Sequence, residues 1–282
     1  MPETLYLIDG YAQIFRAYYA IRGGMRSPAT GEPTHAVFGV TSLLIKLLRD
    51  IRPEYVVVAL DAPGNTFRDD LYGEYKGTRR ETPDDLISQI PRIFELVERF
   101  GIAQVKVPGL EADDIIATIV QRVLDDPAHG GVNVRIASKD KDLEQLLCER
   151  VVMHDIQTDT LTDVAALHAN KGITPAQVID LLTLTGDTVD NVPGVDGIGP
   201  KTAAQLIQQF GSLDGILASL DKLTAKRRES FEKAAAHLPL SRTLVTLKRD
   251  GDFQFTLDQA RVRPPDPARL IPLFQELGFN RF

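Results

Sequence analysis

Glu111, Asp113 and Asp114 place three carboxylates within four residues, directly before an apolar helical pattern. Asp113 stands where a helix N-cap is expected, and a single acidic residue there would need no other explanation. Three neighbouring carboxylates, however, repel one another unless a cation lies between them. The stretch therefore predicts a divalent-metal site whose other ligands lie elsewhere in the chain.

Three short apolar runs are typical of buried parallel strands, and acidic residues follow each of them: Asp9 follows 5–8, Asp61 follows 55–60, and Asp140 and Asp142 follow 132–137. In open α/β sheets, ligands bind at such strand ends. Asp9 with Gly10 would equally suit a simple turn, and Asp142 would suit a helix cap, whereas Asp140 has no capping role in the pattern. The repetition favours one shared site.

Farther along, Asp187 and Asp190 are spaced i, i+3 and would share a face if their segment were helical. The candidate ligands are then nine oxygen donors: Asp9, Asp61, Glu111, Asp113, Asp114, Asp140, Asp142, Asp187 and Asp190. Such ligands favour Mg²⁺ or Mn²⁺ over Zn²⁺, and nine exceed the needs of one Mg²⁺. Two ions are therefore expected, a pair suited to in-line displacement at phosphorus.

Aromatic and cationic side chains alternate after the second strand, with Tyr72 and Tyr75 beside Lys76 and Arg79. This mixture suits stacking on unpaired bases and gripping phosphates. The alternative is a solvated surface segment whose aromatic rings only pack.

A second candidate for phosphate contact is a glycine-rich hairpin before Pro200, a residue that suits the first position of a helix. Gly197 and Gly199 let backbone amides approach a phosphate, and Lys201 and Thr202 open the helix beside them. A plain helix–turn–helix connection is the alternative, and three glycines in six residues argue against it.

Strand-like and helical segments alternate up to about residue 168, which predicts a mostly parallel sheet flanked by helices. The segment 151–156 would add an edge strand. Thr82 and Pro83 predict the start of a helix that Pro91 kinks or interrupts. After residue 168 the pattern becomes helical.

Composition limits the class of protein, with 43% apolar and 25% charged residues among 282, as in ordinary globular chains. A lone cysteine, Cys148, excludes an internal disulfide and fits a reducing compartment. No signal peptide or membrane-spanning run is visible, so a cytoplasmic protein is expected. The net charge of −7 at first argues against nucleic acid, but without the nine candidate ligands acidic and basic residues would nearly balance.

The ordered series of motifs resembles the flap-endonuclease family, and within it the 5′ nuclease domain at the N-terminus of bacterial DNA polymerase I. The resemblance covers nearly the whole chain and rests on these segments: Asp9-Gly10, Asp61, Phe67-Arg68, Tyr75-Lys76, Arg79, Glu111 to Asp114, Asp140 to Asp142, Gly186 to Asn191, and Gly197 to Ala203. Tyr11-Ala12 departs from the small polar residues frequent in relatives, and this affects no candidate ligand.

The resemblance implies a PIN-like, mostly parallel α/β sheet with a helical arch at about 68–100. It also implies a C-terminal helical subdomain with a helix–three-turn–helix motif at about 184–211. The catalytic unit would span 1–167 and the DNA-binding helical unit 168–265. The last residues, 266–282, would form a helix or the start of a linker.

The resemblance also assigns roles to residues. The first ion would be surrounded by Asp9, Asp61, Glu111, Asp113, Asp114 and Asp140. The second would be held by Asp142, Asp187 and Asp190, with Asp140 nearby. Lys76 and Arg79 would neutralise the scissile phosphate, and K⁺ would bind at the glycine hairpin. The other expected DNA contacts are Arg16, Arg22, Arg68, Tyr72, Tyr75, Gly197, Gly199, Lys201 and Thr202.

The implied activity is 5′→3′ exonuclease and structure-specific 5′-flap endonuclease cleavage of DNA with two Mg²⁺, for which Mn²⁺ substitutes, in primer removal and repair. The partner would be branched or nicked duplex DNA with a 5′ flap or 5′ end. A covalently attached polymerase domain fits the same resemblance, and a monomer associated with the nucleoid is expected. Two other classes stay open: a branched-DNA binding module without cleavage, and a carboxylate phosphatase acting on small molecules.

Overall fold

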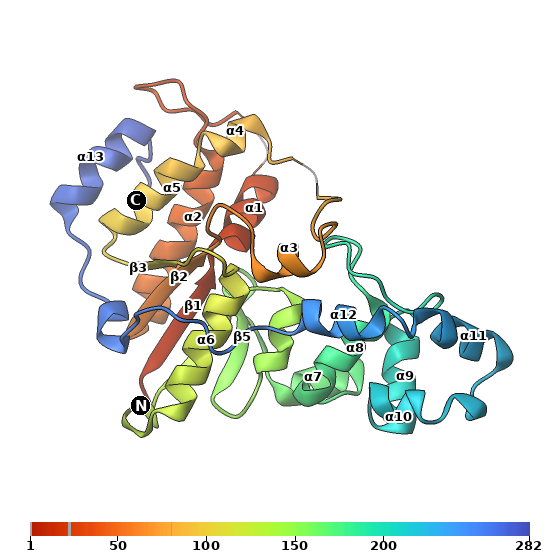
Figure 1. Cartoon of the computed structure of the whole chain (residues 1–282). Helices are drawn as coiled ribbons and strands as arrows, with labels where there is room; N and C mark the ends of the chain where they lie inside the picture. Colours follow the sequence, from red (N-terminus) through yellow and green to blue (C-terminus); the bar gives the residue numbers. More distant parts are fainter. Residues whose placement is uncertain (1, 22–23, 80) are drawn as a thin grey trace.

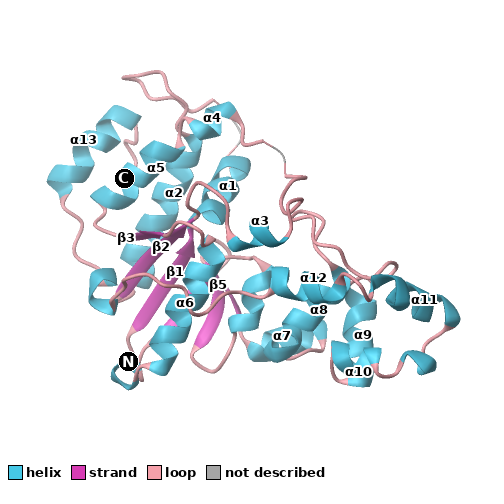
Figure 2. Cartoon of the chain, viewed as in Figure 1, coloured by secondary structure: helices cyan, strands magenta, loops and turns pink. Residues whose placement is uncertain are grey.

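A six-stranded sheet forms the centre of the protein, whose computed structural model describes residues 2–21, 24–79 and 81–282. The strand order is β3-β2-β1-β4-β5-β6, and neighbouring strands are parallel except for β5 with β6 (Figure 2). The strands are β1 Thr4–Asp9, β2 Tyr55–Leu60, β3 Ala103–Lys106, β4 Asn133–Ala137, β5 Val151–Asp155 and β6 Thr160–Thr162. The predicted sheet is confirmed, although β6 lies outside the expected edge strand.

Alternate residues of each strand face two different cores, because successive side chains of a strand point to opposite faces. In β1, Leu5 and Leu7 pack in the first core, and Tyr6 and Ile8 pack in the second. Helix α6 covers the first face, and the helices over the second face include α1, α2, α5 and α13 (Figure 1). These helices are α6 Ala112–Asp125, α1 Gly10–Ala20, α2 His35–Lys46, α5 Ile90–Arg99 and α13 Pro267–Leu277.

The segment expected as a helical arch is not one helix. It contains two short helices, α3 Phe67–Leu71 and α4 Asp84–Ile87, and α4 is capped by Pro83 rather than Thr82. Pro91 lies in the first turn of α5, where a proline is tolerated, so the helix begins anew there. Leu86 of α4 and the apolar side of α5 pack in the second core, so this part of the expected arch belongs to the helices that cover the sheet.

Six helices form a unit beside the sheet (Figure 1). They are α7 Val164–Lys171, α8 Val178–Thr185, α9 Pro200–Phe210, α10 Leu213–Leu217, α11 Ala225–Ala234 and α12 Leu238–Val245. The first core continues into this unit through Leu181, Leu182 and Leu184 of α8. After α12 the chain returns to the sheet, where the N–H of Val262 donates to the carbonyl of Glu54 (2.8 Å). Residues after α12, expected in the helical unit up to 265, therefore run back along the catalytic unit.

Short helical turns complete the described elements. They are the π-helix η1 Leu47–Ile51 and the 3₁₀ turns η2 Pro127–His129, η3 Lys141–Leu146, η4 Pro175–Gln177, η5 Leu220–Lys222 and η6 Leu257–Ala260. Within the described ranges, no helix is both long and apolar enough to cross a membrane.

Candidate active site

The strand order sets the position of the candidate site. From β1 the chain continues through β2 and β3 on one side, and β4 then pairs on the other side of β1. Ligands of open sheets bind at such a reversal, beyond the carboxyl ends of the strands. A cavity of about 390 Å³ lies there, and its lining includes Asp9, Asp61, Glu111, Asp113 and Asp140 together with Lys76 and Arg79. Five of the nine candidate ligands thus come together from four strand ends.

Helix starts hold these carboxylates in place. Asp9 is the N-cap of α1 and accepts hydrogen bonds from the N–H of Ala12 (3.1 Å) and from Ser138 Oγ (3.0 Å). Asp61 accepts from the N–H of Ala112 at the start of α6 (2.7 Å). The cap of α6 itself is Glu111, not Asp113 as the sequence suggested. The start of α1 therefore fixes Asp9, and the start of α6 fixes Asp61 from the neighbouring strand as well as its own cap Glu111.

Asp140 also has a structural contact that the sequence pattern did not indicate. It is the N-cap of η3 and accepts from the N–H of Asp142 (2.9 Å). The expectation that Asp140 lacks a capping role was therefore wrong. The residue still lines the cavity, so the side chain that caps η3 is also a candidate ligand.

The electrostatics of the cavity favour a bound cation. Burial, reinforced by Asp140 and Asp61, raises the pKa of Asp9 to about 6. Burial and Asp140 likewise raise the pKa of Asp142 to about 7, and burial with Asp9 raises the pKa of Asp113 well above its usual range. Each raised pKa means that burial and neighbouring carboxylates disfavour the charged form of the side chain. A hard divalent cation fits these oxygen donors and would relieve the repulsion.

The last two candidate ligands lie in a turn rather than on a helix. Asp187 accepts from the N–H groups of Val189 (2.7 Å) and Asp190 (3.1 Å), and its backbone pairs with Val192. The condition for a shared helix face, a helical segment, is therefore not met. Gly186 has φ 65° there, and a Cβ on it would lie 2.5 Å from the carbonyl oxygen of Val192, so only glycine fits.

Several cationic side chains pair with candidate ligands. Lys76 Nζ lies 2.8 Å from Glu111, Arg79 Nη2 lies 2.5 Å from Asp190, and Lys141 pairs with Asp187. Across the described part of the chain, no three His, Cys, Asp or Glu side chains are gathered closely enough to hold a metal ion. Five candidate ligands therefore line one cavity without being close enough to hold an ion as they stand, and the protein's own cations balance part of the charge of the candidate ligands.

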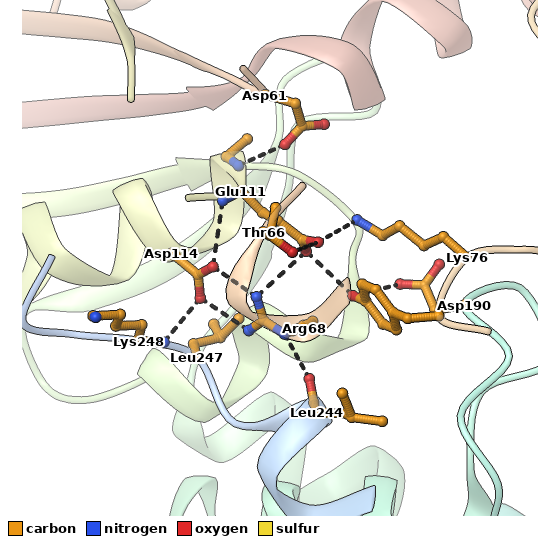
Figure 3. Close-up of polar contacts among 12 residues, drawn as sticks. Asp61, Thr66, Arg68, Lys76, Glu111, Asp114, Asp190, Leu244, Leu247 and Lys248 are labelled. Carbon is orange, nitrogen blue, oxygen red and sulfur yellow. Dashed lines mark hydrogen bonds and ion pairs between the residues drawn. The ribbon is translucent and has the colours of Figure 1, made fainter. Parts of the chain in front are cut away.

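Arg68 and Asp114 are buried and are not among the residues that line the cavity. Figure 3 shows them paired with each other. Asp114 is fully buried, and both of its oxygens accept from Arg68, at 2.6 and 2.9 Å. The expectation that Arg68 contacts DNA is wrong because its side chain is 2% exposed. Tyr75 is buried too, with its hydroxyl 3.2 Å from Glu111, so the expected stacking on bases is also wrong.

The other expected DNA contacts have different surroundings. Arg16 donates to both oxygens of Asp155 (2.6 and 3.1 Å), so a phosphate contact would require this pair to open. Arg22 lies outside the described residues. Tyr72 is partly exposed, and its hydroxyl donates to Glu74 (3.2 Å).

The glycine hairpin presents backbone to solvent. Gly197 is exposed with φ 74°, and Gly199 is the exposed N-cap of α9. Lys201 is exposed in the first turn of α9 and Thr202 beside it is partly buried. Residues of α12 hold the other arm of the hairpin, where Ser241 Oγ donates to the carbonyl of Pro193 (2.7 Å).

Sequence reasoning missed two aromatic residues of the cavity. Tyr11 and Phe15 line it from α1, the helix capped by Asp9. Their spacing of four residues places them on one helix face beside the expected ligand Asp9, and this spacing could have indicated them from the sequence.

Comparisons with known proteins agree with this geometry. Residues 4–173 match the model of the 5′-3′ exonuclease N-terminal resolvase-like domain, and residues 173–268 match that of the 5′-3′ exonuclease C-terminal SAM fold. A 5′-3′ exonuclease of Aquifex aeolicus is 36% identical over 98% of this chain and 92% of its own length. DNA polymerase I of Chloroflexus aurantiacus is 40% identical over 98% of this chain and 30% of its own length.

The fold has a solved counterpart as well. A bacteriophage T5 flap endonuclease in complex with DNA and metal ions superposes with a TM-score of 0.72 at 22% identity, covering 87% of this chain and 90% of that one. The chain spans about a third of the length of the DNA polymerase I relatives it matches, such as that of Bacillus caldotenax (32%). From both family matches and the Aquifex relative, this chain belongs to the 5′-3′ exonuclease family.

Proposed function

We propose that this protein hydrolyses DNA phosphodiester bonds at 5′ ends and 5′ flaps, using two Mg²⁺ ions for which Mn²⁺ substitutes. The observation that carries the proposal is the convergence of strand-end carboxylates on one cavity with two cationic side chains at its wall. When bound, the ions supply an acidified water and charge neutralisation at phosphorus. Family membership in the 5′-3′ exonucleases supports the same reaction.

In this proposal, different residues of the chain bind the two ions and the scissile phosphate. The cavity carboxylates hold the first ion, and Asp142, Asp187 and Asp190 hold the second. Lys76 and Arg79 exchange their carboxylate partners for the scissile phosphate, since both are cations at the edge of the ligand cluster. The released charge on Glu111 and Asp190 is then balanced by the ions.

Contacts to duplex DNA are assigned to the glycine hairpin. Its exposed backbone and the N-terminus of α9 suit a phosphate, and main-chain carbonyls of the hairpin suit K⁺. Such contacts read the backbone rather than the bases, so recognition depends on DNA shape and not on sequence. Branched or nicked duplex DNA is the proposed substrate, bound by a monomer that acts on the nucleoid and, as in the DNA polymerase I relatives, within a longer chain that carries a polymerase.

A 5′-labelled flap duplex tests the proposal. With Mg²⁺ we expect cleavage near the junction of single and double strand, and with EDTA or Ca²⁺ no cleavage. Binding without cleavage in Mg²⁺ would instead indicate a branched-DNA binding module. Hydrolysis of a small phosphate ester that flap DNA does not inhibit would indicate a phosphatase.

A further inference from the structure

Arg68 and Asp114 form a doubly hydrogen-bonded ion pair in the interior. The side chain of Arg68 is 2% exposed and that of Asp114 is 0% exposed. Two parallel N–H···O contacts, at 2.6 and 2.9 Å, match the planar guanidinium to the carboxylate. Both charges are removed from water, so neither is available to substrate without breaking this pair.

The remaining hydrogen-bonding groups of the pair bind two further segments. Arg68 Nε donates to the carbonyl of Leu244 (2.8 Å) and Nη2 donates to that of Thr246 (3.1 Å), at the end of α12. Asp114 accepts from the N–H of Lys248 (2.9 Å). The pair therefore joins α3, α6 and the chain that leaves α12 (Figure 3).

The same pair contacts the one residue of this stretch that both caps α6 and lines the cavity. Arg68 Nη1 lies 3.5 Å from Glu111 Oε2, and Asp114 Oδ2 accepts from the N–H of Glu111 (3.4 Å). On the other side of Glu111, Lys76 from the arch contacts Oε1. Oε2 of Glu111 thus faces the buried pair and accepts from the Tyr75 hydroxyl (3.2 Å), while Oε1 faces Lys76, a side chain that can leave.

We propose that Arg68 and Asp114 are positioning residues for Glu111, and that Asp114 itself binds no cation. The proposal rests on the proposed two-ion function, since that function gives Glu111 an ion to bind. It replaces the expected ligand role of Asp114 with a role as acceptor for Arg68. Groups that orient metal ligands in this way change ion affinity when they are removed.

The test is a calorimetric Ca²⁺ titration of the intact chain. The double variant Arg68→Met with Asp114→Leu removes both buried charges together, which avoids leaving one unpaired. We expect it to bind as many ions as the wild type, with affinity for one ion lowered about tenfold or more. Asp113→Asn, at the cavity wall, should instead reduce the number of ions bound.

A second readout follows the arch itself. Trypsin should cut the double variant faster after Lys76 and Arg79, because α3 loses its anchor. Arg68→Lys, which keeps a charge beside Asp114, should recover part of the ion affinity and of the resistance to trypsin. Arg92→Met is the matched control, since it breaks ion pairs to Glu32, Glu95 and Glu276 and leaves the cavity residues unchanged.

The outcomes separate this proposal from the function on which it rests. A wild type that binds no Ca²⁺ would refute the two-ion function and, with it, the role given to Glu111. If the wild type binds ions and the double variant binds one fewer, Asp114 is a ligand and the proposal is overturned. Unchanged affinity and unchanged trypsin sensitivity would leave the pair a purely structural contact, which also overturns it.

Discussion

Asp140 caps η3 and also lines the cavity, and a single substitution can separate these two roles. Asp140→Asn keeps an oxygen that can cap η3 and removes the negative charge. We expect Mg²⁺-dependent flap cleavage to fall about a hundredfold or more, the effect of losing one transition-state contact. Single-turnover cleavage measures this, and the melting temperature in EDTA should not fall. Asp252→Asn, at an exposed site, should change neither quantity.

The raised pKa values predict a pH-dependent stability of the ion-free protein. Asp9 titrates at about 6 and Asp142 at about 7 in the folded chain, whereas aspartate in an unfolded chain titrates near 4. The folded state therefore binds more protons across this window, so the stability that these groups contribute at low pH is lost as the pH rises through 6 to 7.

Thermal unfolding between pH 5 and 8 measures this dependence. In EDTA we expect the melting temperature to decline across the window, and with saturating Ca²⁺ the decline should disappear. The double variant Asp9→Asn with Asp142→Asn should show a flatter profile in EDTA, because its amides do not titrate. Identical profiles with and without Ca²⁺ would show that no cation binds these carboxylates.

Neighbouring residues of one motif differ in a way that residue types do not reveal. Asp113 lines the cavity and Asp114 is fully buried, because successive residues of a helix point about 100° apart. The sequence identified the carboxylates, but it did not show which of them is already paired with a cationic side chain inside the protein. Arg68 is that partner, and it lies 46 residues away in the chain. Two residues so far apart in the sequence leave no local pattern from which their contact could be predicted.

At the scale of elements, the strands and their acidic ends were predictable and the arch was not. Buried strands give continuous apolar runs, and a parallel sheet brings their carboxyl ends to one edge. The segment between α3 and α4 has no apolar stripe of its own, so its shape depends on contacts to other segments. One such contact is the N–H of Lys76, which donates to the carbonyl of Asp190 (3.0 Å).

The turn that carries Asp187 and Asp190 depends on Gly186. Gly186→Ala would force a Cβ against the Val192 carbonyl and impose φ 65° on an L-residue. We expect a loss of about 1–3 kcal/mol in unfolding free energy, with weaker Ca²⁺ binding, as the turn shifts. Chemical denaturation and calorimetry measure the two effects.

A second glycine provides the control for this element. Gly211 also has a positive φ, 85°, but a Cβ there meets no atom within 4 Å. Gly211→Ala should therefore lower stability through backbone strain alone and leave Ca²⁺ affinity unchanged. Equal loss of ion affinity in both variants would mean that the turn at Gly186 does not position the aspartates.

At the scale of the whole molecule, the return of the chain to the sheet was the least predictable feature. The sequence suggested a helix or the start of a linker at 266–282, and neither reading says what the segment packs against. In the structure α13 buries side chains beside α2 and α5 in the second core. Because this packing joins residues some two hundred positions apart, only the folded arrangement reveals it. The two termini of the chain are thereby parts of one core.

That packing makes α13 a determinant of folding rather than an appendage. Truncation after Pro265 would remove Leu270, Leu273, Leu277 and Phe279, all buried in the second core. Burial of each such side chain contributes roughly 1.5–3 kcal/mol, and their sum is comparable with the net stability of a typical domain, about 5–15 kcal/mol. We expect the truncated chain to lose cooperative thermal unfolding and its near-ultraviolet dichroism. Truncation after Asn280 should retain both, because it keeps these four buried side chains and removes only Arg281 and the partly exposed Phe282, whose ring packs on Phe38. Cooperative unfolding of the chain truncated after Pro265 would contradict the role given to α13.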